Sequence, residues 1–313
     1  MAMEYRQLGR CGLRVSAISI GGWLTIGGSV DEAASDAILR AAIDGGVNFV
    51  DLADIYAKGE AERVAGRTLR HYPRHELVVS TKVFWPMSAD DNDRGLSRKH
   101  IVESVERSLK RLGMDYLDIY FCHREDPEVP LEETSRAMDD LVRQGKILHW
   151  GTSMWSPKRL RAACRIARRL GADGPVVEQP RYNLLHRSIE RRVMPTVRRL
   201  GMGLVVWSPL AGGVLTGKYL GQTPAGSRGA SGDLVRDDLA DAARRRVRDF
   251  IEVAKGLGHE PGPVALAWLL ARPGVSSVIT GATRPEHVRD NLQALSITLT
   301  PESIRDIGRL FRR

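Results

Sequence analysis

The sequence is poor in cysteine and in long apolar segments. Its three cysteines, Cys11, Cys122 and Cys164, are too few and too scattered for a disulfide framework, and they lack the CxxC spacing of a structural zinc site. No apolar run approaches the roughly 18–20 residues of a membrane span. The opening segment, MAMEYRQLGR, has no apolar core of the kind a signal peptide needs. These absences predict a cytoplasmic protein with no membrane partner and no metal site.

A dinucleotide-binding fingerprint of the G-x-G-x-x-G type is also missing. The glycines after the first apolar run stand as Gly21-Gly22-Trp23 and Gly27-Gly28, and neither group opens a helix with the required spacing. An open, doubly wound sheet would need such a phosphate-binding turn beside a strand. This alternative fold therefore loses support.

Acidic residues are outnumbered by basic ones, and the net charge is +9. Much of the excess lies in arginine pairs and one triplet that are spread along the chain: Arg168-Arg169, Arg191-Arg192, Arg198-Arg199, Arg244-Arg245-Arg246 and Arg312-Arg313. A basic balance can indicate nucleic-acid binding. Here, however, the surrounding segments have the period of amphipathic helices, and no aromatic residues interleave with the arginines. We interpret the pairs as solvated helix faces and expect no nucleic-acid partner.

Short apolar runs alternate with longer helical patterns through the whole chain. Eight runs have the length and composition of strands: Ala17–Ile20, Phe49–Leu52, Leu77–Lys82, Leu117–Cys122, Ile147–Thr152, Val176–Gln179, Leu204–Trp207 and Ser277–Thr280. Helical patterns are expected near residues 31–44, 60–69, 98–112, 131–144, 157–170, 189–200, 263–271, 285–292 and 301–311. Ser97 is expected to cap the third helix, which should end at Gly113.

Eight strand–helix units with no long linker predict one domain over residues 1–313, an α/β fold of the (β/α)8 TIM-barrel type with extra C-terminal helices. The segment Tyr5–Ser16 predicts an N-terminal β-hairpin that turns at Arg10–Gly12 and plugs one end of the barrel. The region from Ala211 to about Asp238 is irregular and rich in Gly, Pro, Ser and Asp. We expect this loop to fold over a ligand, because long loops on the catalytic face of a barrel are commonly functional.

Titratable side chains stand where three successive predicted strands end. Asp51 ends the second strand and Tyr56 follows it, Lys82 ends the third strand, and His123 follows the fourth. In a barrel these ends meet at one mouth. A lysine ammonium lowers the pKa of a nearby phenol, an aspartate can hold the lysine, and a histidine can donate a hydrogen bond to a carbonyl oxygen that is becoming an alkoxide. The four residues predict the reduction of an aldehyde or ketone, with Tyr56 as proton donor.

Each of these residues also has a structural interpretation when taken alone: a core tyrosine, a snorkelling lysine, a strand-end histidine or a turn-capping aspartate. A metal site at His123-Arg124-Glu125-Asp126 is a weaker alternative, because adjacent residues rarely converge on one ion. A nucleophilic Cys122 is also weak, since a cysteine inside a strand is usually a buried apolar residue.

Several segments together resemble the aldo-keto reductases: Phe49–Tyr56, Ser80–Lys82, Asp118–His123, Gly151–Ser153, Glu178–Asn183 and Trp207–Gly213. With further likeness out to Asn291, the resemblance spans nearly the whole chain. Residues 56–62, and residues 207–210 through Gly217-Lys218-Tyr219, are most similar to the branch that contains voltage-gated potassium-channel β subunits and their bacterial relatives. The resemblance implies a catalytic tetrad of Asp51, Tyr56, Lys82 and His123.

The resemblance also implies which residues bind a nicotinamide cofactor. Trp207 would stack on the nicotinamide, and Ser153, Met154 and Gln179 would fix its carboxamide. Around the mouth, the pyrophosphate and the adenosine end, the remaining residues would be Gly22, Trp23, Asp51, Ser208, Pro209, Leu210, Ala211, Gly212, Lys218, Arg228, Gly281, Thr283, Arg284, His287, Asp290 and Asn291. Arg284 or His287 could contact a 2′-phosphate, which favours NADPH over NADH.

The sequence departs from the family pattern at Leu52, at Met154 and at His287, and the last departure weakens the inference on cofactor preference. The presence of His123, which channel β subunits often lack, favours a working reductase over a regulatory subunit that binds NADP(H) with little turnover.

The substrate is expected to be a small carbonyl compound near Tyr56 and His123. Its pocket is expected to include Trp23, Trp85, Trp155 and Tyr182, although Trp85 and Trp155 could instead anchor loops. A homo-oligomer is possible.

Overall fold

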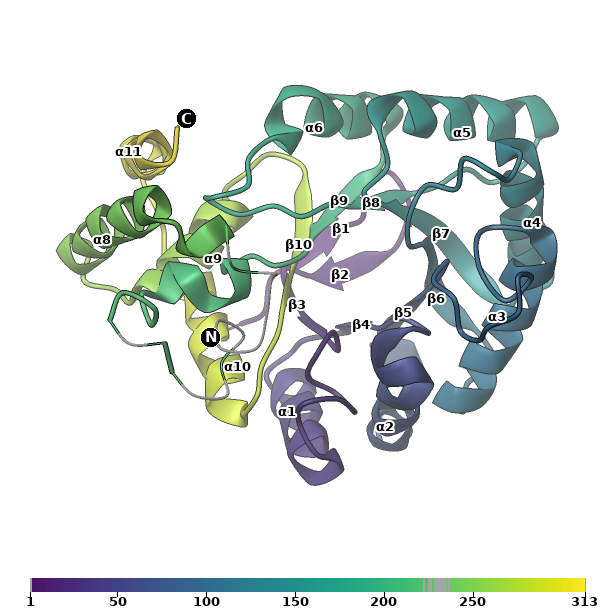
Figure 1. The fold of residues 1–313 in the computed structure, drawn as a ribbon, viewed down its shortest axis with the longest axis horizontal. Helices are drawn as coiled ribbons and strands as arrows, with labels where there is room; N and C mark the ends of the chain where they lie inside the picture. The colour runs from purple at the N-terminus through teal and green to yellow at the C-terminus, as the bar shows by residue number, and fades with distance from the viewer. Residues whose placement is uncertain (1, 222, 225–226, 228–234, 236, 313) are drawn as a thin grey trace.

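Eight parallel strands close into a barrel in the computed structural model, which describes residues 2–221, 223–224, 227, 235 and 237–312 (Figure 1). The strands follow one another around the barrel in chain order, and β10 closes it by pairing with both β9 and β3. They are β3 Ile18–Gly21, β4 Phe49–Asp51, β5 Val78–Val83, β6 Leu117–Cys122, β7 Ile147–Ser153, β8 Val177–Gln179, β9 Gly203–Val206 and β10 Val275–Thr280. The barrel predicted from the sequence is confirmed, and the open doubly wound sheet is wrong.

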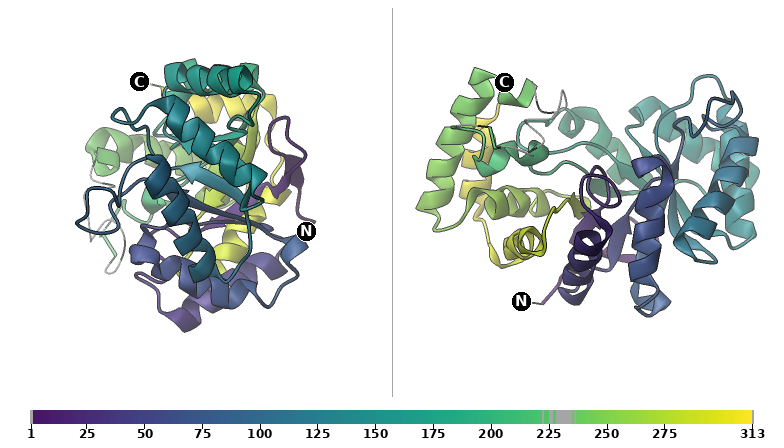
Figure 2. Two further views of the ribbon diagram at one scale, coloured as in Figure 1. Left: turned by 90° about the vertical axis from the view of Figure 1, so that its right-hand side faces the viewer. Right: turned by 60° about the horizontal axis from the view of Figure 1, so that its bottom comes forward.

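Helices surround the strands, as both views of Figure 2 show. They are α1 Glu32–Asp44, α2 Glu60–Leu69, α3 Arg98–Leu112, α4 Leu131–Arg143, α5 Pro157–Leu170, α6 Ile189–Leu200, α8 Asp241–Gly256, α9 Pro261–Leu270, α10 Pro285–Leu292 and α11 Pro301–Leu310. The expected cap of α3 is present: the Ser97 side chain accepts a hydrogen bond from the backbone N–H of His100, and Gly113 ends the helix with φ 67°.

Helix α8 is absent from the sequence-based expectations. Its buried residues are Ala243, Val247, Phe250 and Ala254, which recur at the three- and four-residue spacing of an amphipathic helix. This period is present in the sequence, but the arginine triplet after Ala243 and the irregular region before the helix made it hard to recognise. Helix α8 packs beside α11 at the left of Figure 1, so the extra C-terminal helices form a small layer outside the barrel.

The N-terminal hairpin plugs the bottom of the barrel. Strands β1 (Tyr5–Gln7) and β2 (Arg14–Ser16) pair antiparallel, with Tyr5 opposite Ser16. Leu8 is fully buried and packs in one apolar cluster with inward-facing strand residues such as Phe49 and Val205. Because the hairpin occupies this end, only the mouth at the carboxyl ends of the strands remains for a site.

Among the described residues of the long region after β9, the 3-10 turn η3 (Ala211–Thr216) lies near the start and the 3-10 turn η5 (Asp237–Leu239) lies near the end. The expected irregular loop is therefore partly ordered at both described ends. Within the part of the chain that the structure describes, no helix is long and apolar enough to cross a membrane.

Candidate active site

A buried lysine–aspartate pair lies at the mouth of the barrel. Asp51 ends β4 and Lys82 lies on the neighbouring strand β5; their exposed fractions are 3% and 0%. The Lys82 Nζ donates to Asp51 Oδ2 at 2.6 Å and to the carbonyl oxygen of Leu52 at 2.6 Å. Burial lowers the pKa of Lys82, but the Asp51 carboxylate beside it outweighs that effect, so the net pKa is raised. The lysine is therefore a permanent cation at neutral pH.

The second oxygen of Asp51 is held from two sides. Ser80 Oγ donates to Asp51 Oδ1 at 2.8 Å, and Gln179 Nε2 donates to the same oxygen at 2.9 Å. Gln179 ends β8, so this contact joins the two sides of the mouth. A buried carboxylate held by three donors is rigid, and it fixes the ammonium of Lys82 in one place.

Tyr56 contacts this pair through its hydroxyl group. Lys82 Nζ donates to Tyr56 Oη at 3.2 Å. The chain after the tyrosine turns sharply, since Ala57, Lys58 and Gly59 all have left-handed φ values of 47°, 52° and 89°. Two of the three are not glycine, so the backbone stores strain where the phenol must be aimed.

The pKa of Tyr56 differs from the sequence-based expectation. Lys82 does favour the phenolate, but burial acts more strongly in the other direction, and the net pKa lies above its usual value near 10. The expectation that the Tyr56 pKa is lowered overall is therefore wrong. Tyr56 is a protonated phenol at neutral pH, which is the form that a proton donor needs.

His123 completes the group from the end of β6. Its ring centroid lies 5.9 Å from that of Tyr56, with the planes nearly perpendicular. Burial, followed by the charges of Lys82 and Arg124, lowers the pKa of His123 well below 6.5, so the ring is neutral. Its Nδ1 is buried and has no hydrogen-bond partner among the described residues. A neutral imidazole beside the phenol can take part in a hydrogen bond with a bound ligand.

The residues expected at the nicotinamide lie on the strands opposite Tyr56. Ser153 Oγ donates to the carbonyl oxygen of Gln179 at 2.9 Å, and Gln179 in turn contacts Asp51. Met154 follows with φ 61° and is 44% exposed. Trp207, just after β9, is half-buried, and its ring lies edge-on to that of Trp23, with centroids 5.7 Å apart.

The residues expected at the pyrophosphate form a tight turn after Trp207. Ser208, Ala211 and Gly212 have left-handed φ values, and Gly213 follows with φ 96°. A Cβ on Gly213 would lie 2.7 Å from Lys218 Nζ, so this glycine lets the lysine approach the turn. The other expected members of this turn are Pro209, which is buried, and Leu210. Arg228 lies outside the described residues.

The residues expected at the adenosine end lie after β10 and on α10. Thr283 contacts His287, whose Nδ1 lies 3.3 Å from the threonine hydroxyl. Burial, then the charges of Arg284 and Lys218, lower the pKa of His287. Lys218 and Arg284 therefore both present positive charge to the region around His287. Gly281 and Asp290 are exposed here, and Asn291 is buried.

The aromatic residues expected around the substrate divide into two groups. Trp85 is 36% exposed and its ring centroid lies 6.2 Å from that of His123, so it borders the mouth. Trp155 and Tyr182 were expected in the substrate pocket, but they are only 1% and 0% exposed and offer no surface to a ligand. The Tyr182 hydroxyl donates to Glu190, and the Trp155 backbone N–H donates to the buried Glu178. Both are anchors of the fold.

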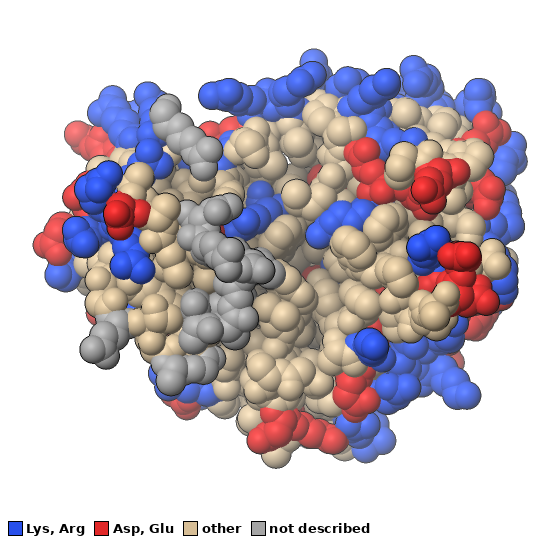
Figure 3. All heavy atoms as spheres, viewed as in Figure 1, with Lys and Arg blue, Asp and Glu red and all other residues tan. Residues whose placement is uncertain are grey.

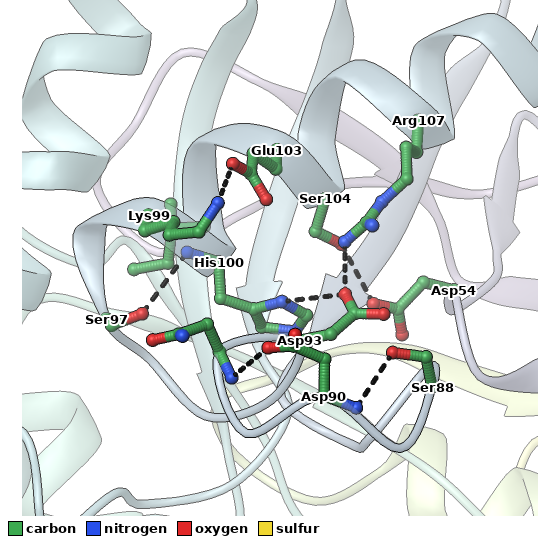
Figure 4. Close-up of polar contacts among 12 residues, drawn as sticks. Asp54, Ser88, Asp90, Asp93, Ser97, Lys99, His100, Glu103, Ser104 and Arg107 are labelled. Carbon is green, nitrogen blue, oxygen red and sulfur yellow. Dashed lines mark hydrogen bonds and ion pairs between the residues drawn. The ribbon is translucent and has the colours of Figure 1, made fainter.

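The loop that carries Trp85 is fastened to α3 by polar contacts (Figure 4). Arg107 donates to Asp93 at 2.5 Å, and the buried His100 ring faces the same carboxylate at 3.4 Å. On the neighbouring turn, Ser104 donates to Asp54 at 2.9 Å. Helix α3 therefore holds both the loop after β5 and the segment that leads to Tyr56.

The alternatives at His123–Asp126 have other roles in the structure. The Asp126 carboxylate accepts the backbone N–H of Leu96 at 2.8 Å, and Glu125 accepts that of Ser156. The two carboxylates thus turn to different neighbours. Burial raises the pKa of Cys122, which keeps this thiol protonated and unreactive.

Three site residues escaped the sequence analysis. Ser80 lies two positions before Lys82 on one strand face, a signal that the period of two could have given. Arg124 follows His123 and lies 5.5 Å over the Trp85 ring. Arg181 lies 5.8 Å over the Trp207 ring and also pairs with Asp238 at 2.7 Å. The contacts of both arginines depend on tertiary structure alone.

Fold and geometry together define a (β/α)8 barrel in which Asp51, Tyr56, Lys82 and His123 gather at the carboxyl ends of the strands. The chain belongs to the aldo/keto reductase family, whose sequence model matches residues 17–311. A protein from Oryza sativa subsp. japonica, described as a probable voltage-gated potassium channel subunit beta, is 46% identical over 97% of this chain and 95% of its own length. An Arabidopsis thaliana protein with the same description is 44% identical, over 96% of this chain and 94% of its own length. A Schizosaccharomyces pombe protein, described as a putative voltage-gated potassium channel subunit beta, is 41% identical over 98% of this chain and 93% of its own length.

Proposed function

We propose that the protein reduces aldehydes or ketones to alcohols with NADPH, and that Tyr56 donates the proton. The observation that carries this proposal is the contact between Tyr56 Oη and a lysine held by a buried carboxylate. Such a lysine stabilises the phenolate that remains after proton transfer. Family membership supports a nicotinamide-dependent oxidoreductase.

The described residues fit a bound nicotinamide cofactor. Trp207 offers a half-buried aromatic face, and Ser153 and Gln179 offer polar groups at the ends of the nearby strands β7 and β8. Lys218 and Arg284 are exposed cations that suit phosphate groups. When bound, reduced nicotinamide supplies a hydride to the carbonyl carbon.

The protein's own groups act on the carbonyl oxygen. The neutral His123 hydrogen-bonds to this oxygen and orients it toward Tyr56. Tyr56 transfers its proton to the oxygen, and Lys82 stabilises the phenolate until solvent returns a proton. Trp85, beside His123, closes one wall of the pocket and favours carbonyl compounds with an apolar or aromatic group.

The test of this function is the Tyr56→Phe variant. We expect purified protein to oxidise NADPH in the presence of an aromatic aldehyde such as 4-nitrobenzaldehyde, followed by the loss of NADPH absorbance. Tyr56→Phe should bind NADPH with unchanged affinity and lose at least about 100-fold in kcat, the usual contribution of a general acid. Full activity in this variant would remove the assigned role.

Cofactor preference has its own measurement. We propose tighter binding of NADPH than of NADH, because Arg284 and Lys218 lie at the expected adenosine and phosphate end. Titration of the protein's tryptophan fluorescence with each nucleotide measures both dissociation constants. Equal constants would contradict the preference while leaving the reductase activity open.

A second function is favoured by the similarity to proteins named as channel β subunits over nearly their full length. In that case the chain would bind NADP(H) and report redox state to a partner, with little turnover. Tight NADPH binding together with negligible turnover on a broad panel of aldehydes and ketones would support this function. Brisk turnover would exclude it.

A further inference from the structure

Two helices on the outside of the barrel together carry a positive charge equal to the net charge of the whole protein. Helix α5 has six basic residues and no acidic one, and α6 has four basic residues and one acidic one. The two helices together therefore carry +9, which equals the net charge of the whole chain. Their exposed arginines, here called the basic face, are Arg161, Arg165, Arg168, Arg169, Arg191, Arg192, Arg198 and Arg199.

The fold brings three of the arginine pairs onto one face, namely Arg168-Arg169, Arg191-Arg192 and Arg198-Arg199. Helices α5 and α6 lie side by side along the upper edge of Figure 1, and blue side chains line the same edge in Figure 3. Within the part of the chain that the structure describes, only Arg169 of the basic face has an acidic partner, Glu132 on α4 at 2.6 Å. Most surface arginines elsewhere, such as Arg309 with Asp306, are paired. The basic face is thus an uncompensated cationic surface.

A shallow groove runs between the two helices within this face. Arg161, Thr196, Arg199 and Leu200 line a hollow of about 440 Å³. Arg199 also borders a second hollow, together with Pro195 and Arg198. The floor is largely apolar and arginines stand on both sides. The volume far exceeds that of a water molecule, about 30 Å³, so the groove has room for an apolar side chain.

We propose that the basic face binds an acidic segment of a partner protein, with an apolar side chain of that segment seated in the groove between α5 and α6. Arginine forks suit carboxylates because they can donate two parallel hydrogen bonds. A second copy of this chain is a poor occupant, since the chain outside α5 and α6 has no net negative charge to offer.

Other polyanions match the face less well. The large exposed hydrophobic residues of the described chain include Tyr5 and Trp85 but none on α5 or α6. The face therefore lacks the aromatic platform of single-stranded nucleic-acid binders and the interfacial aromatic anchors of membrane-surface helices. A flat bilayer would also leave the groove empty. Carboxylates interspersed with an apolar side chain match both features.

The test uses a fluorescein-labelled synthetic peptide with a repeating Glu-Glu-Leu-Glu sequence and measures its anisotropy as the protein is added. We expect saturable binding that weakens more than about tenfold between about 50 and 300 mM NaCl, as salt screens the exposed charges. A peptide with Gly in place of Leu should bind more weakly, because it leaves the groove unfilled. Equal binding of the two peptides would overturn the role of the groove.

Two variants that lose the same number of charges distinguish binding by the basic face from an effect of net charge. The face variant combines Arg161→Gln, Arg165→Gln, Arg198→Gln and Arg199→Gln. The control combines Arg245→Gln, Arg248→Gln, Arg305→Gln and Arg309→Gln, which removes four exposed charges from α8 and α11. We expect the face variant to bind the peptide about tenfold more weakly, as four lost surface pairs imply, and the control to bind nearly as the parent does. Both should keep the parent's unfolding midpoint.

Two results would overturn the proposal. Equal weakening by the two variants would show that only net charge matters. Tighter binding of a DNA duplex, or of vesicles containing phosphatidylserine, than of the peptide would show that the face serves another class of partner. Neither result bears on the reductase activity, because the basic face lies outside the barrel and shares no residue with the mouth.

Discussion

Lys82 illustrates how much one buried charge controls at the scale of the residue. It is completely buried, and Asp51, Leu52 and Tyr56 all lie within hydrogen-bond distance of its ammonium group. Its partner Asp51 is held by two further donors, which satisfies the carboxylate. Removing one member of such a pair leaves an uncompensated charge in the interior.

We expect Lys82→Met to abolish carbonyl reduction and to lower the free energy of unfolding by about 3–5 kcal/mol, the usual cost of a broken buried pair. Urea unfolding measures the stability and NADPH oxidation measures the activity. The double variant Lys82→Met, Asp51→Asn should recover part of the stability, because no charge is then left unpaired, but none of the activity. If the single and double variants are equally unstable, the pair is not the cause.

Glu178 provides a second residue-scale prediction, because it is a fully buried carboxyl group on β8. Burial raises the pKa of Glu178 to about 8, although hydrogen bonds from Thr152 and from the backbone of Trp155 and Met154 act to lower it. In the unfolded chain this group loses its proton near pH 4.5. Between these values the folded protein keeps a proton that the unfolded chain has released. The contribution of Glu178 to stability therefore falls as the pH rises, by up to about 1.4 kcal/mol per pH unit.

We expect Glu178→Gln to flatten this fall between about pH 5.5 and 7.5, because an amide of the same shape does not titrate. The remaining slope would combine Asp54, whose pKa burial raises to about 7, with the opposite contribution of buried histidines such as His123, whose pKa burial lowers. Urea unfolding at several pH values measures the effect, with the exposed Glu302→Gln as control. A slope that is the same in Glu178→Gln and in the parent would rule out this carboxyl group as its source.

At the scale of the element, the packing of α2 against α3 depends on a glycine. A Cβ on Gly66 would lie 2.4 Å from the carbonyl oxygen of Leu112, the last residue of α3. Helix α3 also holds the loop after β5 and, through Ser104 and Asp54, the segment that leads to Tyr56. The close approach of these two helices therefore supports the site.

We expect Gly66→Ala to destabilise the protein, although alanine is the better helix former. The gain in helix propensity is about 1 kcal/mol, whereas a forced backbone overlap costs about 1–3 kcal/mol. Gly256→Ala, at the end of α8, is the matched control: apart from its chain neighbours and its own helix backbone, no atom lies within 4 Å of its Cβ position, so the propensity gain should appear alone. Thermal unfolding measures both. A stabilised Gly66→Ala variant would show that the helices can separate at little cost.

At the scale of the whole molecule, the two ends of the barrel have separate tasks. The hairpin fills the bottom with Leu8 and Val15, both fully buried, and the titratable groups lie at the mouth. This separation is typical of barrels, where one end provides stability and the other provides chemistry.

We expect Leu8→Ala to lower the free energy of unfolding by about 2–5 kcal/mol through a cavity at the bottom, with the NADPH dissociation constant unchanged. Leu13→Ala, in the same hairpin but only partly buried, should cost less. Urea unfolding and fluorescence titration measure the two quantities. A weakened affinity for NADPH in Leu8→Ala would show that the ends are coupled.

The sequence by itself determined the barrel, because eight apolar runs separated by helical patterns leave few other ways to bury those runs. It also determined that Asp51, Lys82 and His123 would meet, since the carboxyl ends of parallel strands share one mouth. Tyr56 follows from its short distance from Asp51. These inferences rest on local periodicity, which survives in the sequence without any knowledge of long-range contacts.

Only the tertiary structure decided what depends on distance and burial. Tyr56 has a raised pKa because burial outweighs Lys82, and Trp155 and Tyr182 are anchors because neighbouring elements cover them. The charge of α5 and α6 forms one face because these two successive helices pack side by side around the barrel with their arginines exposed. Desolvation and the sum of nearby charges are properties of the folded surroundings, and no pattern along the chain records them.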